Sequence, residues 1–379
     1  MTSRRNFLAI AGSSAVILAA GAGGWAMTRT PQTALAPWSH AGQYPDIMRR
    51  ALSWAILAPN PHNRQPWLVD LISEREAVLY VDTERLLPHT DPYNRQIAIG
   101  LGAFLEVFRQ AAAQDGLSAS FNYFPEGESR DQLDTRPIAR IRLQGEAEPD
   151  PLFAAVLQRH TNREPYKTDR HVRVGLLDDL TDWGQNDVAI NAAAEPSRVN
   201  TLRTIAGEAM NIEMMTDRTY MESVDLMRIG KAEINANPDG IAIPGPLPEL
   251  MRSLGPMSHA TLSNLDGAAQ QQSADFVEHQ AATAMAWMWF TSAGNSRTDQ
   301  INTGRDYVRG HLRATQLGLA WQPMSQALQE YPEMADHYAR IHTLLAPEGE
   351  TVQMLVRLGY AAEAKPSPRW PLETRLIDT

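Results

Sequence analysis

The segment APNPHNRQPW (58–67) places the strongest local constraint on this 379-residue chain. Its three prolines each fix φ and remove a backbone N–H, so the segment is neither a regular helix nor a central strand. We expect a stiff loop that presents the polar side chains of Asn60, Asn63 and Gln65 next to Trp67. A helix end followed by a plain turn explains the same residues, so a function for this loop needs support from the rest of the chain.

The composition excludes several classes of protein. A content of 43% hydrophobic and 21% charged residues indicates a globular chain, long enough for one two-lobed domain or two smaller ones. The net charge of −10 argues against nucleic acid as a partner, because backbone binding needs a basic face. The absence of cysteine excludes disulfides, thiolate metal sites and cysteine nucleophiles. We also expect no metal site, since the histidines of HYARIH (337–342) are five residues apart and miss the i, i+4 spacing.

The first residues suggest export. The segment SRRNFL (3–8) places Arg4 and Arg5 directly before a stretch, 7–27, that contains no charged residue. This pattern resembles a twin-arginine signal, and no polar face supports the alternative of a short amphipathic helix. The twin-arginine route carries folded proteins, often with a cofactor already bound, and therefore points to a redox prosthetic group.

We assign residues 1–36 to this signal, which could stay in place as a membrane anchor. The protein is then expected in the periplasm, or anchored in a membrane and facing the periplasm, with no other membrane contact. The small residues at 34–36 suit processing, whereas Pro37 disfavours it. Cleavage therefore stays open.

Hydrophobic periodicity predicts a mixed chain of the α+β class, with antiparallel-type sheets flanked by helices. The expected strands are 77–82, 138–143, 188–194, 284–291 and 352–361. The expected helices are 44–57, 93–114, one ending at 157, 197–215, 303–316 and 327–345. The linker EAEPDP (146–151) divides the chain into two lobes, 37–148 and 149–379.

The two lobes look weakly repeated. The segments 102–117 and 308–319 are both expected helices that end in Gly-Leu and lead into an extended segment. The second lobe also contains a Met- and Pro-rich insert at 210–257, which could form a lid. Its methionines at helical spacing fit an ordinary core equally well.

A basic cluster follows the linker in QRHTNREPY (158–166). Arg159, His160, Thr161 and Arg163 fall within five residues at an expected helix end. Guanidinium groups and a hydroxyl at such a place can surround an anion. The spacing alone fits a solvated helix end as well.

The two motifs together resemble the FMN-dependent nitroreductase family. RHTNREPY (159–166) looks like that family's N-terminal flavin motif, and APNPHNRQPW looks like its Pro-Ser-x-x-Asn-x-Gln-Pro-Trp loop. In typical members both motifs occur in one chain, and a homodimer brings them together. Here each half keeps the motif that the other half lacks, which implies a fused pseudo-dimer with one FMN site, as in Acg-type FMN-binding proteins. The resemblance therefore implies a nitroreductase-like fold and a monomer.

The resemblance also implies roles for individual residues. Those expected at the FMN phosphate and ribityl chain are Arg159, His160, Thr161, Arg369 and Asn60. Those expected around the isoalloxazine ring are Arg163, near the N1–C2=O edge, with Asn63, Gln65 and Trp67 from the other lobe. Ser325 and Gln326 would offer backbone N–H groups to the ring. No side chain is expected to act as an acid or base, because the flavin performs the chemistry.

Two functions follow from this reading. The first is an FMN oxidoreductase that passes electrons to a nitro, quinone or similar small-molecule acceptor. The second is a flavin-binding or storage protein with little turnover, which a lid and an export signal would both suit. The residues specify neither the electron donor nor the acceptor.

Overall fold

The computed structural model describes residues 28–377, which form an α+β structure as the periodicity predicts. The paired arginines and the uncharged stretch 7–27 lie outside the described residues. Within residues 28–377, no helix is long and apolar enough to cross a bilayer.

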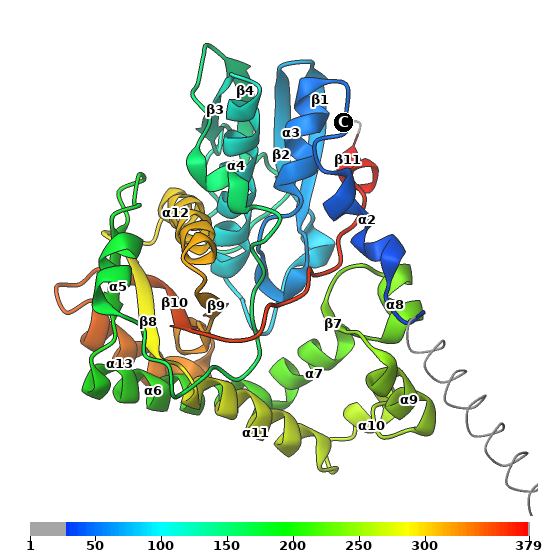
Figure 1. Cartoon of the computed structure of the whole chain (residues 1–379), viewed down its shortest axis with the longest axis vertical. Helices are drawn as coiled ribbons and strands as arrows, with labels where there is room; N and C mark the ends of the chain where they lie inside the picture. The colour runs from blue at the N-terminus through cyan, green and yellow to red at the C-terminus, as the bar shows by residue number, and fades with distance from the viewer. Residues whose placement is uncertain (1–27, 378–379) are drawn as a thin grey trace, which may run out of the picture.

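Two sheets organise the molecule (Figure 1). The first has the order β11-β1-β2-β4-β3, formed by β1 Trp67–Ser73, β2 Glu76–Val81, β3 Ser118–Tyr123, β4 Ala139–Gln144 and β11 Leu376–Ile377. The second has the order β5-β8-β10-β9, formed by β5 Ala189–Ala193, β8 Ala286–Ser292, β9 Ala320–Pro323 and β10 Thr351–Gly359. Apart from the parallel β11, both sheets have the same strand order, the same antiparallel pairing and one long helix before the edge strand β3 or β9.

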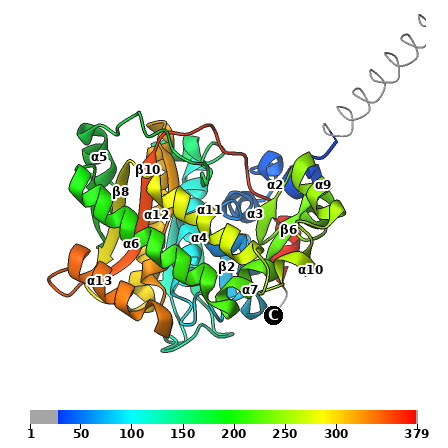
Figure 2. The same cartoon turned by 90° about the horizontal axis from the view of Figure 1, so that it is seen from below.

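The two long helices, α4 (Arg95–Gln114) and α12 (Arg297–Gln316), cross at the centre of the molecule (Figures 1 and 2). Their close approach depends on Gly102 and Gly304. A Cβ on Gly102 would lie 2.0 Å from the carbonyl oxygen of Ile301, and one on Gly304 would lie 1.9 Å from that of Ile99. The two contacts are reciprocal. Gly102 corresponds to Gly304 and Ile99 to Ile301 at the same separation in the sequence, as in the contact between the subunits of a symmetric dimer.

The same offset relates the ends of these helices. Gly116 and Gly318 follow them with φ of 74° and 70°, in the left-handed region that glycine favours. The next residue in each case donates its N–H to an alanine carbonyl five positions earlier, Leu117 to Ala112 at 3.1 Å and Leu319 to Ala314 at 2.9 Å. The weak repeat in the sequence therefore has matching helix caps in the structure.

The lobes differ in how their first two strands connect. A tight turn joins β1 to β2, whereas residues 194–285, here called the excursion, lie between β5 and β8. The excursion contains α6 Pro196–Met215, α7 Asp217–Asp225, β6 Met227–Ile229, α8 Gly230–Ala236, β7 Ile241–Ile243, α9 Pro246–Leu254, α10 His259–Leu262 and α11 Ala269–Ala282. The insert predicted at 210–257 is part of this larger unit, and its Pro-rich stretch contains the helix α9.

The remaining elements complete the layers and correct several predicted boundaries. They are the helices α2 Gln32–His40, α3 Ile47–Ala55, α5 Val174–Thr181 and α13 Ala335–Leu345, and the 3-10 turns η1 Pro61–Asn63, η2 Thr83–Arg85, η3 Pro151–Ala155, η4 Gln326–Leu328, η5 Pro332–Met334 and η6 Leu372–Arg375. The helix expected to end at 157 is only the short turn η3. The helix expected at 327–345 begins at Ala335, because Pro332 can occupy only the first turn of a helix.

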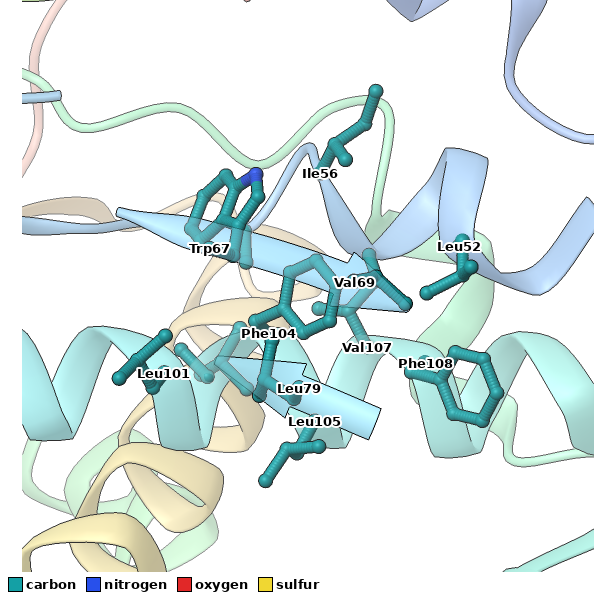
Figure 3. Packing of buried hydrophobic residues seen from close by; sticks show 14 of the residues in the cluster. Leu52, Ile56, Trp67, Val69, Leu79, Leu101, Phe104, Leu105, Val107 and Phe108 are labelled. Carbon is teal, nitrogen blue, oxygen red and sulfur yellow. The ribbon is translucent and has the colours of Figure 1, made fainter. Parts of the chain in front are cut away.

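The core of the first lobe lies between its sheet and α4 (Figure 3). Trp67 begins β1 and is fully buried against Phe104 of α4, with ring centroids 5.1 Å apart. The end of the chain returns to this lobe, where Leu376 of β11 pairs with Val69. Residues 360–375, which we had placed with the second lobe, therefore cross to the first and pass the candidate site.

Candidate functional site

The proline-rich loop has an unusual backbone that its neighbours hold in place. His62, Asn63 and Gln65 have φ of 45°, 50° and 51°, in the left-handed region that side chains other than glycine rarely adopt. The Asn60 side chain accepts the Gln65 N–H at 2.7 Å, and the Asn63 amide donates to the Pro368 carbonyl at 3.0 Å. Such conformations persist only where the surrounding structure enforces them, and they are common at functional sites.

Arg369 connects this loop to the chain end. Its buried guanidinium donates to the carbonyl oxygens of Ile56, Leu57 and Ala58 at 2.8, 3.0 and 3.0 Å. It also donates to the Oδ1 of Asn63 at 2.7 Å. The carbonyls that follow α3 have no partner inside the helix, so Arg369 caps them and fixes the start of the loop.

Arg159 reaches the same point from the second lobe. Its guanidinium is buried and donates to the Leu57 carbonyl at 3.1 Å, and it lies 3.4 Å from Nδ1 of His311 on α12. Burial lowers the pKa of Arg159 to about 10, and burial together with the charge of Arg159 lowers that of Arg369 well below its usual value. The structure thus brings Arg159, Arg369 and Asn63 together, although they are far apart in the sequence.

Arg159 and Arg369, here called the unmatched cluster, have no carboxylate partner within residues 28–377. Burying a cation without a counter-charge is costly, and the repulsion between Arg159 and Arg369 adds to that cost. An anion with several oxygens would accept charge-assisted bonds from these groups and offset the cost. The cluster therefore has the chemistry of a phosphate or carboxylate site.

The other residues of the basic motif line the accessible side of this cluster. His160 meets the ring of Trp38 edge-on at 4.9 Å, and burial with the nearby arginines lowers its pKa to about 3. Arg163 is solvent-accessible, yet its dense surroundings lower its pKa, as expected for a side chain in a recess. Thr161 is half-buried, and no hydrogen-bond partner for its hydroxyl is found in the described part of the chain.

Gln65 and Trp67 have supporting positions rather than the direct contact that the resemblance implies. Gln65 is fully buried, donates to the Pro238 carbonyl at 2.7 Å and accepts the Trp370 N–H at 2.9 Å. Trp67 is fully buried in the apolar core of Figure 3. Asn60 turns back to its own loop, where it also donates to the Ala58 carbonyl at 3.2 Å. These side chains hold the loop in shape.

Ser325 and Gln326 lie just after β9. The Ser325 hydroxyl donates to the Leu355 carbonyl at 3.2 Å and accepts the Leu355 N–H at 3.1 Å, which ties it to β10. Gln326 is half-buried, and its Oε1 has no partner among the described residues. Within residues 28–377, no hydrogen bond or ion pair joins either residue to the unmatched cluster.

Three site residues were not selected from the sequence. Trp38 of α2 lies 5.4 Å from the Arg369 guanidinium, and His311 stacks on Trp321 at 5.0 Å. His62 lies in the loop itself, with a buried Nδ1 that lacks a partner among the described residues. Burial and the charge of Arg163 lower the pKa of His62 to about 4, so it is neutral at physiological pH. The histidine within the loop motif was a visible signal, whereas nothing in the sequence marked Trp38 or His311.

The surface cavities lie elsewhere. One of about 340 Å³ is lined by Asp179, Trp183 and Arg313, and one of about 500 Å³ by Tyr338 and His342. Neither contains a predicted site residue. The candidate site itself is a polar junction between the lobes.

Comparison with known proteins identifies several relatives from Mycobacterium tuberculosis. No protein-family model matches the chain. A Mycobacterium tuberculosis protein named provisionally as the NAD(P)H nitroreductase Acg is 34% identical over 122 residues, which cover 32% of this chain and 36% of that protein. The match thus spans about a third of the relative's length. Another M. tuberculosis protein, uncharacterised, is 25% identical over 342 residues, and one named provisionally as an NAD(P)H nitroreductase is 24% identical over 346 residues. These two alignments cover 87% and 86% of this chain and 92% and 90% of the relatives.

Solved structures give a weaker likeness. A nitroreductase with bound FMN from Desulfitobacterium hafniense aligns with a TM-score of 0.34 and 13% identity, over 61% of this chain and 98% of its own. An FMN-dependent nitroreductase from Mycobacterium smegmatis in complex with NADPH aligns with a TM-score of 0.34 and 16% identity, over 57% and 92%.

Proposed function

We propose that the chain is an FMN-binding oxidoreductase of the nitroreductase type. The observation that carries the proposal is the unmatched cluster, in which arginines of the second lobe meet the proline-rich loop of the first. The FMN phosphate has the charge and oxygen atoms that such a cluster lacks. The names of the M. tuberculosis relatives support the same chemistry.

The residues present fit this cofactor. Arg159 and Thr161 would hold the phosphate, because Arg159 is a buried cation without a counter-charge and Thr161 has an unused hydroxyl. Arg369 donates its N–H groups to Asn63 and to carbonyls next to α3, so it would contribute its positive charge. Arg163 would place a fixed positive charge beside the group that accepts electrons, and the neutral His62 has a buried ring nitrogen to share. When bound, FMN supplies hydride and electron transfer to a nitro, quinone or similar acceptor.

We further propose that the chain arose by duplication and acts as a fused pseudo-dimer, with two lobes in place of two subunits. The identical strand order of the sheets, the reciprocal contacts of Gly102 and Gly304 and the matching caps at Gly116 and Gly318 support this proposal. A site built from both lobes of one chain needs no second copy, so we expect a monomer.

The excursion favours a second candidate, flavin binding with little turnover. It holds the site loop at several points, since Gln65 donates to the Pro238 carbonyl and the Gly240 N–H bonds to the Asn63 carbonyl at 3.2 Å. Asp239 pairs with both Arg64 and Arg85 of the first lobe. A loop tied in this way opens less readily to a large acceptor.

For location we propose export by the twin-arginine route, with the protein held at or released from the periplasmic face of the membrane. The helix α2 bears on processing, because the Arg369 N–H donates to the carbonyl of Ala34 at 2.8 Å and Ala34 is buried. Cleavage after Ala36 would remove this contact with a site residue. We therefore propose that any processing occurs before Gln32, which N-terminal sequencing of the exported protein tests.

The proposal is tested with the purified full chain. We expect a yellow protein with about one FMN per chain, because a single site would lie between the two lobes. The Arg159→Ala/Arg163→Ala double variant should be colourless, whereas Arg340→Ala, which removes an exposed arginine of α13, should stay yellow. A wild-type chain that does not bind added FMN, or a yellow double variant, would refute the proposal. Oxidation of NAD(P)H or a quinol with nitrofurazone or menadione then separates turnover from simple flavin binding.

A further inference from the structure

The helix α9 presents a row of leucines to the outside of the protein. Leu247, Leu250 and Leu254 are 64%, 46% and 72% exposed. Their spacing of three and four residues places them on one face of the helix. Large apolar side chains exposed in a contiguous row mark a contact surface more often than a solvated one.

The surroundings of this row are also poor in charge. Between residues 241 and 265 the sequence has only two charged side chains, Glu249 and Arg252. Both are in ion pairs, Glu249 with Arg29 at 2.9 Å and Arg252 with Glu233 at 2.7 Å. Three exposed prolines extend the apolar area, namely Pro244, Pro246 and Pro256.

The described chain begins beside α8 and α9 (Figures 1 and 2). The Thr28 carbonyl accepts a hydrogen bond from Nζ of Lys231 at 3.0 Å, and the next residue, Arg29, pairs with Glu249 of α9. The stretch 7–27, which has no charged residue, is therefore followed by residues that contact α8 and α9. The same short helix, α9, therefore carries the leucine row and contacts the start of the described chain.

We infer that the leucine face of α9 lies on a lipid bilayer, in the interfacial layer of the membrane that holds residues 7–27. A bilayer accommodates both apolar surfaces at once, and an uncharged stretch of this length is long enough to cross one as a helix. Arg29 and Lys231 lie at the start of the described chain, and basic side chains are favourable beside lipid phosphates. The contact would fix how the protein sits on the membrane, whatever its redox activity.

The absence of cysteine gives a direct test. A Leu254→Cys variant of the full chain carries one environment-sensitive fluorophore, and Val174→Cys on α5, which is 67% exposed, is the matched control. Both are reconstituted into phosphatidylethanolamine–phosphatidylglycerol vesicles. We expect a blue-shifted emission at position 254 that brominated lipids quench several-fold, and neither effect at position 174.

Other outcomes identify other occupants. A blue shift at position 254 that brominated lipids do not quench would assign the face to residues 7–27 themselves, or to a second copy if it depends on protein concentration; either overturns the inference. An unshifted emission on vesicle-bound protein overturns it as well. Independently, Leu247→Glu/Leu250→Glu should weaken vesicle flotation several-fold relative to Phe276→Glu on α11. FMN binding should be unchanged in both variants, which keeps this test separate from the proposed function.

Discussion

Two groups of arginines lie where the lobes meet, and they differ in how their charge is balanced. The matched cluster surrounds the fully buried Glu106 of α4, which pairs with Arg109, Arg305 and Arg309 at 2.6, 3.1 and 2.9 Å. Asp150 adds a second carboxylate, 2.6 Å from Arg309. Burial alone would raise the pKa of Glu106, but the three arginines have the larger effect, so its pKa is lowered. The unmatched cluster has no such carboxylate within residues 28–377.

The two clusters therefore have different roles at the interface: one stabilises the contact between the lobes, and the other can bind an anion. In the matched cluster each charge has a partner inside the protein, so the group can hold the lobes together without a ligand. In the unmatched cluster the guanidinium groups donate to neutral oxygens, and no carboxylate of residues 28–377 balances their charge, so an anion nearby would stabilise them. The interface between the lobes thus contains one arginine cluster that is neutralised by carboxylates and one that is not.

The largest effect is expected from substitutions that separate the lobes where α4 crosses α12. Gly304→Val should lower the free energy of unfolding by about 4 kcal/mol or more, because its side chain would overlap the Ile99 carbonyl. Gly102→Val should have a similar effect at the Ile301 carbonyl. Urea denaturation measures both, with Gly175→Ala, which has nothing within 4 Å, as the control. A tolerated valine at either glycine would show that the crossing is not reciprocal.

The next prediction contrasts the clusters directly. Arg309→Met should destabilise the protein by about 3–5 kcal/mol, because it leaves Glu106 and Asp150 short of a buried partner. Arg159→Met should change the stability of FMN-free protein by less than about 1 kcal/mol, since it removes a buried cation that lacks a counter-charge. FMN titration should give the reverse order, with a dissociation constant about 100-fold higher for Arg159→Met. Equal stability losses in the two variants would contradict the division.

A buried acid outside both clusters gives a pH test. Burial raises the pKa of Glu213, which is 3% exposed on α6, from 4.5 to about 7, and the side-chain hydrogen bond from Gln329 opposes that rise only in part. The folded state therefore binds the proton more tightly than the unfolded state, so stability is full below pH 4.5 and falls by roughly 3 kcal/mol as the pH rises to about 7. Urea denaturation across this range should show the fall in wild type, and Glu213→Gln should reduce it. If the stability of Glu213→Gln falls with pH as steeply as that of wild type, another group causes the effect.

The smallest predicted effect is protection by a simple anion. Phosphate should stabilise FMN-free wild type by about 1 kcal/mol, because it occupies the unmatched cluster. Thermal unfolding in phosphate and in chloride of equal ionic strength measures the difference. Arg159→Met should lose this protection, whereas the phosphate effect should persist in Arg340→Ala, which removes an exposed charge. Equal protection of all three proteins would indicate a general salt effect.

Local patterns were enough to predict the main elements of the fold. The apolar stripe and Gly-Leu end of 102–117 identified α4, and alternation identified β2, β4 and β10, because these signals depend on residues adjacent in the chain. The start of α12 was missed, since Ser296 and Asp299 form its capping box before the apolar stripe begins. The strand β1 was also missed, because Trp67 follows three prolines, whereas β3 and β9 were expected only as extended segments after the Gly-Leu helix ends.

The sequence by itself determined which chemistry is available: a rigid loop of amides, a group of arginines after the linker and no thiol. Only the tertiary structure decided that Arg159 and Arg369 share the Leu57 carbonyl, that Gln65 and Trp67 are buried supports, and that other arginines of the interface are neutralised by Glu106. The physical reason is that propensity and spacing act along the chain, whereas the balance of a buried charge depends on which groups folding places within a few ångströms of it.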